Sequence, residues 1–181
     1  LEKYPSEEPA RQLENPVWHI HSGNPPAETT PVSFALLLNL VAVANPEDKS
    51  QLWGFISQYA PDASPEKNLL LDELAGYAMS YYQDFVLPQK TYRAPTDKER
   101  AAMEDLSARL KAFDGEPTSE NLQTLTFSVG KEHEFENLRE WFQALYEVLL
   151  GQSQGPRFGS FAALYGVANT ARLMDEALAR D

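Results

Sequence analysis

The chain has 181 residues, 43% of them hydrophobic and none of them cysteine, and its formal net charge is −12. This length and hydrophobic content are typical of one or two globular domains and exclude a disordered chain. The lack of cysteine excludes disulfides and cysteine-ligated zinc and fits a reducing, cytoplasmic setting. The acidic charge argues against a protein that coats duplex DNA.

No segment of the sequence is predicted to cross a membrane or to direct secretion. The most apolar run is residues 34–44, about half the length that a membrane-spanning helix requires. The chain opens at Leu1 on polar residues instead of a basic and apolar signal segment. Because the first residue is not methionine, we expect the chain to be a piece of a longer protein.

The acidic charge is unevenly distributed. Residues 87–113 contain six basic and four acidic side chains, and residues 151–181 contain three of each. Residues 31–86 and 114–150 are both strongly acidic. An anionic partner is therefore expected to contact the two non-acidic segments.

The N-terminal part of the sequence differs from the rest. Residues 1–30 are rich in proline and glutamate, and they predict a lead-in segment with one helical turn near residues 7–13. Pro16, Pro25 and Pro26 are expected to prevent regular helix in the second half of this segment. Beyond it, apolar residues recur at steps of three and four, which predicts helices. The predicted helices cover residues 34–44, 46–59, 67–86, 96–113, 119–129 and 135–150.

Short signals set the expected ends of these helices. Thr30 and Pro31 have the types expected at an N-cap and first helical position, and Thr96 with Glu99 forms a capping-box pattern. Gly130 is expected to end the fifth helix. Within the third helix, apolar residues at helical spacing predict one apolar face made of Leu70, Leu74, Tyr77, Tyr81 and Phe85.

The end of the chain combines helical sequence with four glycines, Gly151, Gly155, Gly159 and Gly166. Glycine takes left-handed backbone conformations without strain, so we expect a sharp turn here, with Arg157 and Phe158 exposed at its tip. Short helices are expected at residues 160–165 and 169–179. No segment alternates with period two for long enough to predict a strand. The predicted fold class is therefore all-α, a multi-helix bundle.

Histidines and carboxylates do not indicate an enzyme active site in this chain. His19 and His21 lie two residues apart without a third ligand nearby, so a structural or solvated role is favoured over a metal site. Ser22 beside His21 has the composition of a hydrolase nucleophile and base but lacks the surrounding turn. We assign no catalytic residue and no metal ligand, and an independent hydrolase that uses His21 and Ser22 stays a third hypothesis.

Two short motifs have the composition of a contact with single-stranded RNA. The first combines Lys90 and Arg93 with Tyr92, and such combinations of cations and aromatic rings bind unpaired nucleotides. Arg157 and Phe158, at the glycine turn, form the second. On composition alone, an ordinary charged loop anchored to the core by its aromatic ring is the favoured explanation of each motif.

Five segments, in the same order along the chain, resemble class I lysyl-tRNA synthetases. The most specific is residues 145–166 (LYEVLLGQSQGPRFGSFAALYG), at the C-terminal end of that family. The others are residues 15–21 (NPVWHIH), 31–40 (PVSFALLLNL), 81–86 (YYQDFV) and 90–95 (KTYRAP). The resemblance covers essentially the whole chain and is to the bacterial branch of the family.

This resemblance implies a parent enzyme that activates lysine with ATP and Mg²⁺ and transfers it to lysine tRNA. ATP and lysine would bind an N-terminal Rossmann domain, and the present chain would be the all-helical C-terminal region, called an α-helix cage, that binds the anticodon. Residues 1–60 would form a lead-in and connecting helical segment, and residues 61–181 the cage. The chain itself is expected to bind no cofactor, to be inactive alone, and to contact lysine tRNA and the catalytic domain but neither membrane nor DNA.

Anticodon reading depends on stacking and on base-edge contacts, so an acidic protein needs few phosphate contacts to perform it. On this basis the candidate RNA contacts are Lys90, Tyr92, Arg93, Arg157 and Phe158. The alternative hypothesis is an acidic all-helical protein–protein interaction module without RNA binding. That alternative is favoured if Lys90, Arg93 and Arg157 lie on separate faces of the protein and bury the aliphatic parts of their side chains.

Overall fold

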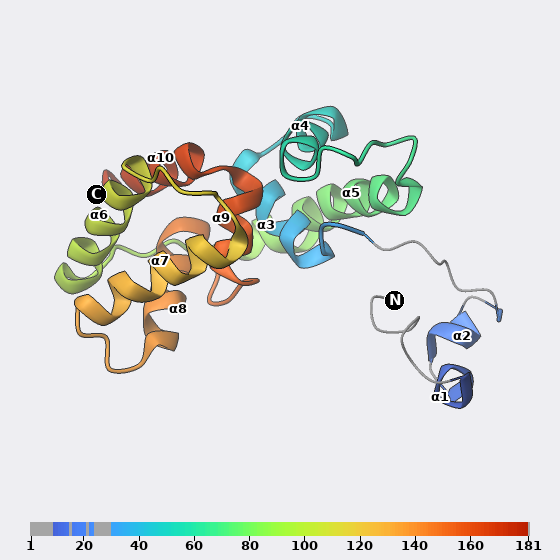
Figure 1. Cartoon of the computed structure of the whole chain (residues 1–181), viewed down its shortest axis with the longest axis horizontal. Coiled ribbons are helices and arrows are strands. Elements are labelled where there is room, and N and C mark those ends of the chain that lie inside the picture. Colours follow the sequence, from blue (N-terminus) through green and yellow to red (C-terminus); the bar gives the residue numbers. More distant parts are fainter. Residues whose placement is uncertain (1–8, 15, 21, 24–29, 181) are drawn as a thin grey trace.

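The computed structural model describes residues 9–14, 16–20, 22–23 and 30–180, and in these ranges every regular element is a helix (Figure 1). The all-α prediction is therefore confirmed. None of the helices in the described residues is long and apolar enough to cross a membrane.

The two most N-terminal helices are short and pack on each other. Helix α1 is Pro9–Glu14 and helix α2 is Pro16–Ile20. The expectation that proline prevents helix is wrong at Pro16, because proline at the first helical position loses no hydrogen bond. Pro25 and Pro26 lie outside the described residues.

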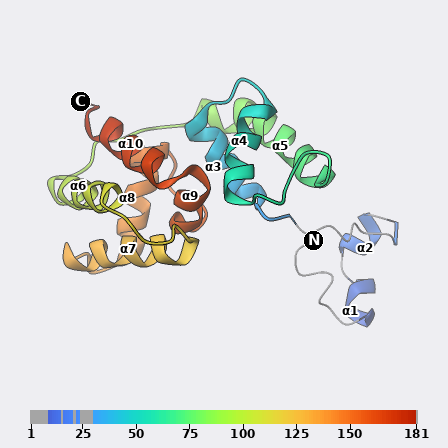
Figure 2. The same cartoon turned by 45° about the horizontal axis from the view of Figure 1, so that its top comes forward.

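A first group of helices forms one half of the body (Figure 2). It consists of α3 (Phe34–Ala44), α4 (Lys49–Tyr59) and α5 (Leu69–Tyr81). Helix α3 has the predicted bounds and packs against both of the others, which is why it is apolar on nearly all sides. Fully buried side chains of this group are Leu37, Leu40, Leu52, Ile56 and Leu71.

The N-terminal caps of two helices test the helix starts predicted from the sequence, one at residues 30–31 and one at Thr96. The Ser33 hydroxyl, not that of Thr30, caps α3 by accepting a hydrogen bond from the N–H three residues on, at 3.3 Å. Pro31 therefore precedes the helix and is not its first residue. The capping box of Thr96 and Glu99 is confirmed, with both reciprocal hydrogen bonds present.

The end of α5 changes its winding. A π-helix, η2 (Tyr82–Val86), follows α5 directly, and a 3₁₀ turn, η3 (Leu87–Gln89), ends the segment. The expected apolar face is not the buried one, since Tyr77 is 63% exposed and Phe85 57% exposed. The buried face lies one residue further along and consists of Leu71, Ala75, Ala78 and Tyr82. Small residues on that face allow the close approach of α3.

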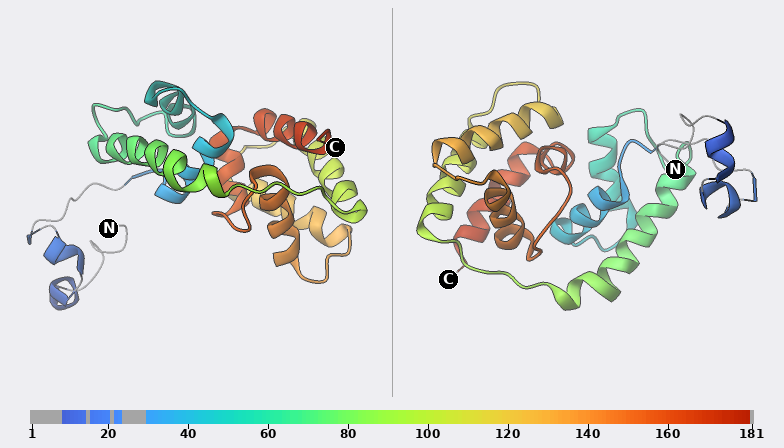
Figure 3. Two further views of the ribbon diagram at one scale, coloured as in Figure 1. Left: turned by 180° about the vertical axis from the view of Figure 1, so that it is seen from behind. Right: turned by 90° about the horizontal axis from the view of Figure 1, so that it is seen from below.

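The second group of helices forms the other half of the body, seen beside the first in Figure 3. Helix α6 packs against α10, and α7 packs against α9. Trp141 of α8 is fully buried at the centre and donates its indole N–H to the Thr126 carbonyl at 3.0 Å. The helices of this group are α6 (Asp97–Lys111), α7 (Ser119–Glu132), α8 (Leu138–Leu150), α9 (Phe158–Tyr165) and α10 (Val167–Leu178).

Gly130 lies inside α7, so the expectation that it ends the helix is wrong. A Cβ at this position would lie 2.6 Å from Cδ1 of Trp141. The glycine therefore permits close packing of α7 against the buried indole, which outweighs its low helix propensity.

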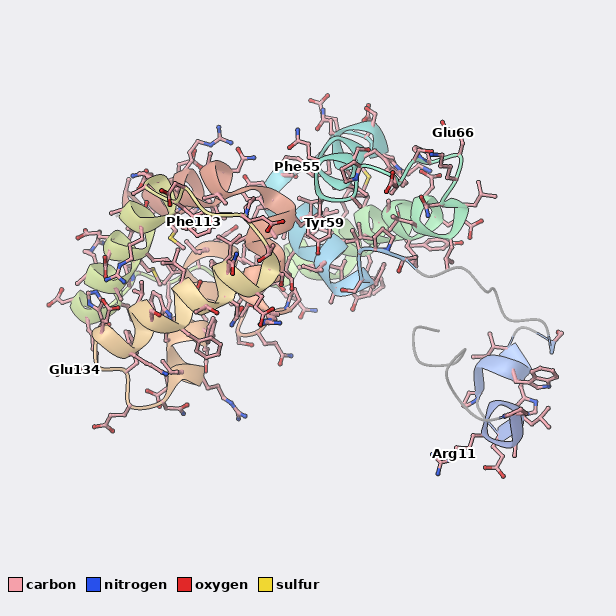
Figure 4. All side chains as sticks on the ribbon, viewed as in Figure 1. Arg11, Phe55, Tyr59, Glu66, Phe113 and Glu134 are labelled. Carbon is pink, nitrogen blue, oxygen red and sulfur yellow. The ribbon has the colours of Figure 1, made fainter. Side chains whose placement is uncertain are left out.

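Helix α9 connects the two halves, because it packs on α3 and α4 as well as on α7. Phe55 of α4 stacks near Tyr165 of α9, with ring centroids 5.5 Å apart. Figure 4 labels Phe55 on the side of α4 that faces the second group. The division at residue 60 inferred from the sequence stays a prediction.

Candidate nucleic-acid interface

A cleft of about 1010 Å³ opens where the two groups of helices meet. Its walls are one side of α3, the end of α5 with η2, the loop of residues 87–95, and the glycine turn of residues 151–156. The lining residues are Ala35, Leu38, Asn39, Tyr81, Phe85, Val86, Gln89, Lys90, Thr91, Arg93, Glu147, Gly151, Gln152, Ser153, Gln154, Gly155 and Pro156.

The cleft brings together the two segments in which the sequence places its RNA-binding motifs. The Thr91 N–H donates a hydrogen bond to the Gly151 carbonyl at 3.1 Å, so the loop and the glycine turn lie side by side, as Figure 3 also shows from behind. Lys90 and Arg93 line the cleft, whereas Tyr92 and Phe158 do not. Arg157 directly follows the last lining residue.

Lys90 attaches the loop to the body of the protein. Its Nζ donates to the Ala42 carbonyl at 2.9 Å, near the C-terminal end of α3, where the helix dipole favours a cation. It also donates to the Tyr92 hydroxyl at 2.8 Å and lies 5.3 Å from the centre of the Tyr82 ring. Most of the binding capacity of this ammonium group is therefore used inside the chain.

Arg93 joins two helices of the second group through their carboxylates. Its guanidinium donates to both oxygens of Glu99, at 2.7 and 2.8 Å, and to Glu147 at 2.5 Å. The hydrogen bonds to Arg93 lower the pKa of both carboxyls, and both groups are therefore ionised at neutral pH. Two negative charges thus surround one positive charge, and Arg93 holds the loop in place more than it offers a cation to a ligand.

Tyr92 is 44% exposed but is also engaged. The Arg180 guanidinium lies over its ring, 4.6 Å from the centroid. The hydroxyl accepts the hydrogen bond from Lys90 described above. Tyr92 therefore connects the loop to the C-terminal end of α10 instead of lining the cleft.

The second predicted motif separates into one exposed and one buried residue. Arg157 is exposed, and within the described residues its side chain has no hydrogen-bond or ion-pair partner. Phe158 is only 2% exposed and its ring packs against Phe161, 5.9 Å between centroids. The expectation of an exposed Phe158 is wrong, because α9 begins at this residue and turns its ring into the core.

The glycine turn is held against the body by Tyr146. This side chain is buried, burial raises the pKa of its hydroxyl, and the neutral hydroxyl donates to the Pro156 carbonyl. A Cβ on Gly155 would overlap the Tyr146 ring, since it would lie 2.7 Å from Cδ1 and closer still to Cε1. Gly151 has φ of +66°, so it turns the chain in the left-handed region at the end of α8, as the sequence predicts.

Two exposed aromatic residues of the cleft are absent from the predicted contacts. Tyr81 is 45% exposed and Phe85 is 57% exposed, and their ring centroids are 5.1 Å apart. Their spacing was consistent with a core-facing stripe. The parallel row of apolar residues one position further along the helix includes Ala75 and Ala78. Its small side chains are the signal that this row is buried and that the two rings face solvent.

Asn39 is a further lining residue that the sequence did not indicate. It lies on the cleft side of α3 and is only 3% exposed. Its Nδ2 has no hydrogen-bond partner, alone among the buried side-chain nitrogen and oxygen atoms of the described residues. The charged lining residues are Lys90, Arg93 and Glu147, so the cleft is nearly balanced in charge.

Comparison with known proteins finds relatives over nearly the whole chain. A lysine–tRNA ligase of Roseobacter denitrificans is 55% identical over 179 residues, which are 99% of this chain and 34% of that protein. Lysine–tRNA ligases of Rickettsia bellii and Rickettsia conorii are 46% and 44% identical, over 98% and 96% of the chain. The chain is therefore similar, over nearly its whole length, to one region of these lysine–tRNA ligases. It spans about one third of the length of these curated relatives. No protein-family model matches the chain.

Neither of the two histidines that the structure describes lines the cleft. His19 is exposed on α2, and His133 lies 3.0 Å from Asp105, away from the lining residues. No group of three or more metal-ligating side chains occurs in the part of the chain that the structure describes. His21 lies outside that part, so the hydrolase hypothesis stays untested.

Proposed function

We propose that this chain is the anticodon-binding region of a class I lysyl-tRNA synthetase, and that the cleft receives unpaired nucleotides of lysine tRNA. The whole protein would be a cytoplasmic ligase that joins lysine to lysine tRNA with ATP and Mg²⁺. Those cofactors would bind the catalytic domain, which lies outside this chain, so the chain alone would not aminoacylate tRNA.

The observation that carries the proposal is the composition of the cleft. Tyr81 and Phe85 offer exposed rings on which bases stack, and the neighbouring turn offers backbone groups and short polar side chains. Arg157 stands at the end of the turn as an unpaired cation for a phosphate. A site of this kind needs few cations, which is compatible with the net charge of −12.

The proposed roles of the sequence-predicted residues differ from one another. Arg157 is the candidate for direct phosphate contact. Lys90 and Arg93 hold the loop that forms one wall, and Tyr92 holds that loop to α10. Phe158 anchors the start of α9 in the core, and its ring packs against Phe161 and against Tyr146, the residue that holds the turn.

A specific observation also favours the alternative of a protein–protein interaction module. The stems of Lys90 and Arg93 are half-buried, and their charged groups are engaged by the chain itself. Against this, both residues lie in one cleft together with the glycine turn. That common location is the reason that we favour RNA binding.

The test is binding of the 181-residue chain to an RNA hairpin that carries the lysine anticodon, at one fixed salt concentration. We expect salt-sensitive binding that is weakened when the anticodon is replaced and the stem is kept. Equal affinity for the two hairpins would contradict base reading by this chain. No measurable binding, with the chain fully folded by circular dichroism, would favour the interaction module.

A further inference from the structure

We propose that Asn39 reads the Watson–Crick edge of an unpaired uracil base in the cleft. This inference rests on the proposed function, since it assigns one base-specific contact within the same site. Asn39 has three properties that together indicate a missing ligand: it lines the cleft, it is 97% buried, and its Nδ2 has no partner.

An unpaired donor of this kind is uncommon in folded proteins. More than about 90% of buried polar groups are hydrogen-bonded, and leaving one unpaired costs about 1–3 kcal/mol. The other buried polar side chains show this rule: Thr126 donates to the Leu122 carbonyl at 2.8 Å, and Gln123 accepts from the Gly159 N–H at 2.7 Å. An apolar residue at position 39 would avoid this penalty, so the unpaired amide points to a partner from outside the chain.

The glycine turn lies directly over this amide. A Cβ on Gly155 would lie 2.8 Å from Nδ2 of Asn39. The missing side chain at Gly155 therefore lets the backbone approach the amide closely, and a base reaches Nδ2 only when the turn is displaced. Tyr81 and Phe85 line the same cleft, so a stacking surface and an edge-reading group belong to one site.

The chemistry of the amide matches uracil. A carboxamide presents one donor and one acceptor side by side. Uracil presents its O4 acceptor beside its N3–H donor, so Nδ2 donates to O4 while Oδ1 accepts from N3–H. Cytosine has the reverse order, a donor at N4 beside an acceptor at N3. With Nδ2 toward position 4 of the base, the amide pairs with uracil, whereas the amide rotated by 180° would pair with cytosine, so the two pyrimidines are distinguished by the amide orientation.

The test compares wild type, Asn39→Leu and the control Thr126→Val. The leucine variant keeps the number and branching of the side-chain heavy atoms and removes both polar groups. Thr126 is also buried and is not among the residues that line the cleft. The probes are RNA hairpins with the lysine anticodon in which each uridine is replaced in turn by cytidine. Binding is measured at one salt concentration, and folding by circular dichroism and thermal unfolding.

We expect wild type to prefer uridine at one anticodon position by about tenfold or more, as for a good bidentate base contact. Asn39→Leu should reduce that preference to near unity while its unfolding temperature is unchanged or higher, because an unpaired donor is removed. Thr126→Val should keep the preference. Asn39→Ala is interpreted in the same way if leucine does not fit.

Different results would overturn different statements. If Asn39→Leu folds and keeps the full preference for uridine, the role of Asn39 is wrong and a bound water satisfies Nδ2 instead, while the proposed function stands. If wild type binds every hairpin equally or binds none, base reading fails and the role of Asn39 fails with it.

Discussion

Each of the two segments that line the cleft contains or directly precedes basic side chains, but these side chains are used in opposite ways. In the loop of residues 87–95, Lys90 and Arg93 are both engaged by carbonyls, rings and carboxylates of neighbouring helices. Directly after the glycine turn, the Arg157 side chain has no partner within the described residues. The first segment uses its cations to fix its own position, and the second leaves its cation available to solvent.

The difference follows from what surrounds each segment. The loop passes between α6 and α8, which contribute Glu99 and Glu147. The glycine turn contacts Tyr146 and Asn39, which are both neutral at neutral pH. A basic residue in a sequence is therefore a candidate for ligand contact only when no carboxylate, carbonyl or aromatic ring of the fold already engages it.

The largest effect on stability is expected from a side chain added where α9 packs on α7. Gly159→Ala should lower the free energy of unfolding by about 3 kcal/mol or more, since overpacking against backbone is poorly relieved. A Cβ there would overlap the Ser119 carbonyl and lie 2.6 Å from the Gln123 nitrogen. Urea unfolding measures the change.

The matched control is Gly54→Ala in α4, where a Cβ would meet nothing within 4 Å. It should raise the free energy of unfolding by about 0.5–1 kcal/mol, as expected from helix propensity. If both variants had similar stability, the close approach of α9 to α7 would not be a constraint on the turn.

The second prediction concerns the loop. Arg93→Ala leaves Glu99 and Glu147 without their shared partner and should lower the free energy of unfolding by about 1–2 kcal/mol, a value reduced for the partial exposure of this arginine. The free energy of unfolding of Arg93→Lys should lie between those of Arg93→Ala and wild type, because an ammonium group keeps the charge but lacks the bidentate geometry of a guanidinium. If Arg93→Ala instead lost RNA affinity at unchanged stability, Arg93 would be a ligand contact and not a structural cation of the loop.

The third prediction is the acid dependence of the same cluster. The pKa values of Glu99 and Glu147 are lowered by Arg93 in the folded chain, so the unfolded chain binds more protons as the pH falls. The stabilisation is fully present above the unfolded glutamate pKa of about 4.3 and is lost as the pH falls through the lowered folded values. Urea unfolding at several pH values should give a shallower acid slope for Arg93→Ala than for wild type. Parallel slopes would mean that the ion pairs do not form in solution.

The smallest effect on stability is expected at the glycine turn's cation. Arg157→Ala should change the free energy of unfolding by less than about 0.5 kcal/mol, as for an exposed side chain without partners. It should weaken hairpin binding about three- to tenfold and reduce the salt dependence by about one counterion. Arg139→Ala, an exposed arginine of α8 outside the cleft, is the matched control and should change neither. Equal effects of the two variants would indicate general charge attraction.

Much of the fold follows from local signals in the sequence. The bounds of α3 and the capping box of α6 could be predicted because apolar spacing and cap chemistry act within a few residues. The buried face of α5 could not, because two stripes one residue apart have similar spacing, and only the close contact with α3 selects the one with small residues. Gly130 misleads for the same reason, since its partner Trp141 belongs to another helix.

The site was predictable only as two separate motifs. Sequence chemistry selected the loop and the glycine turn, but their adjacency depends on how α8 ends beside the loop. The engagement of Arg93 and the burial of Phe158 depend on side chains from distant parts of the chain. Asn39 carried no signal at all, because its importance lies in a hydrogen bond that is not made.

The hydrogen bond from Thr91 to Gly151 joins the walls of the cleft through backbone atoms alone. Its strength is therefore independent of the side chain at position 91, with proline as the exception because it has no N–H. Rim residues on this side can vary in sequence while the spacing of the walls is preserved. The architecture thereby separates the frame of the cleft from the side chains that choose its ligand, and ligand preference can change by substitution without refolding the frame.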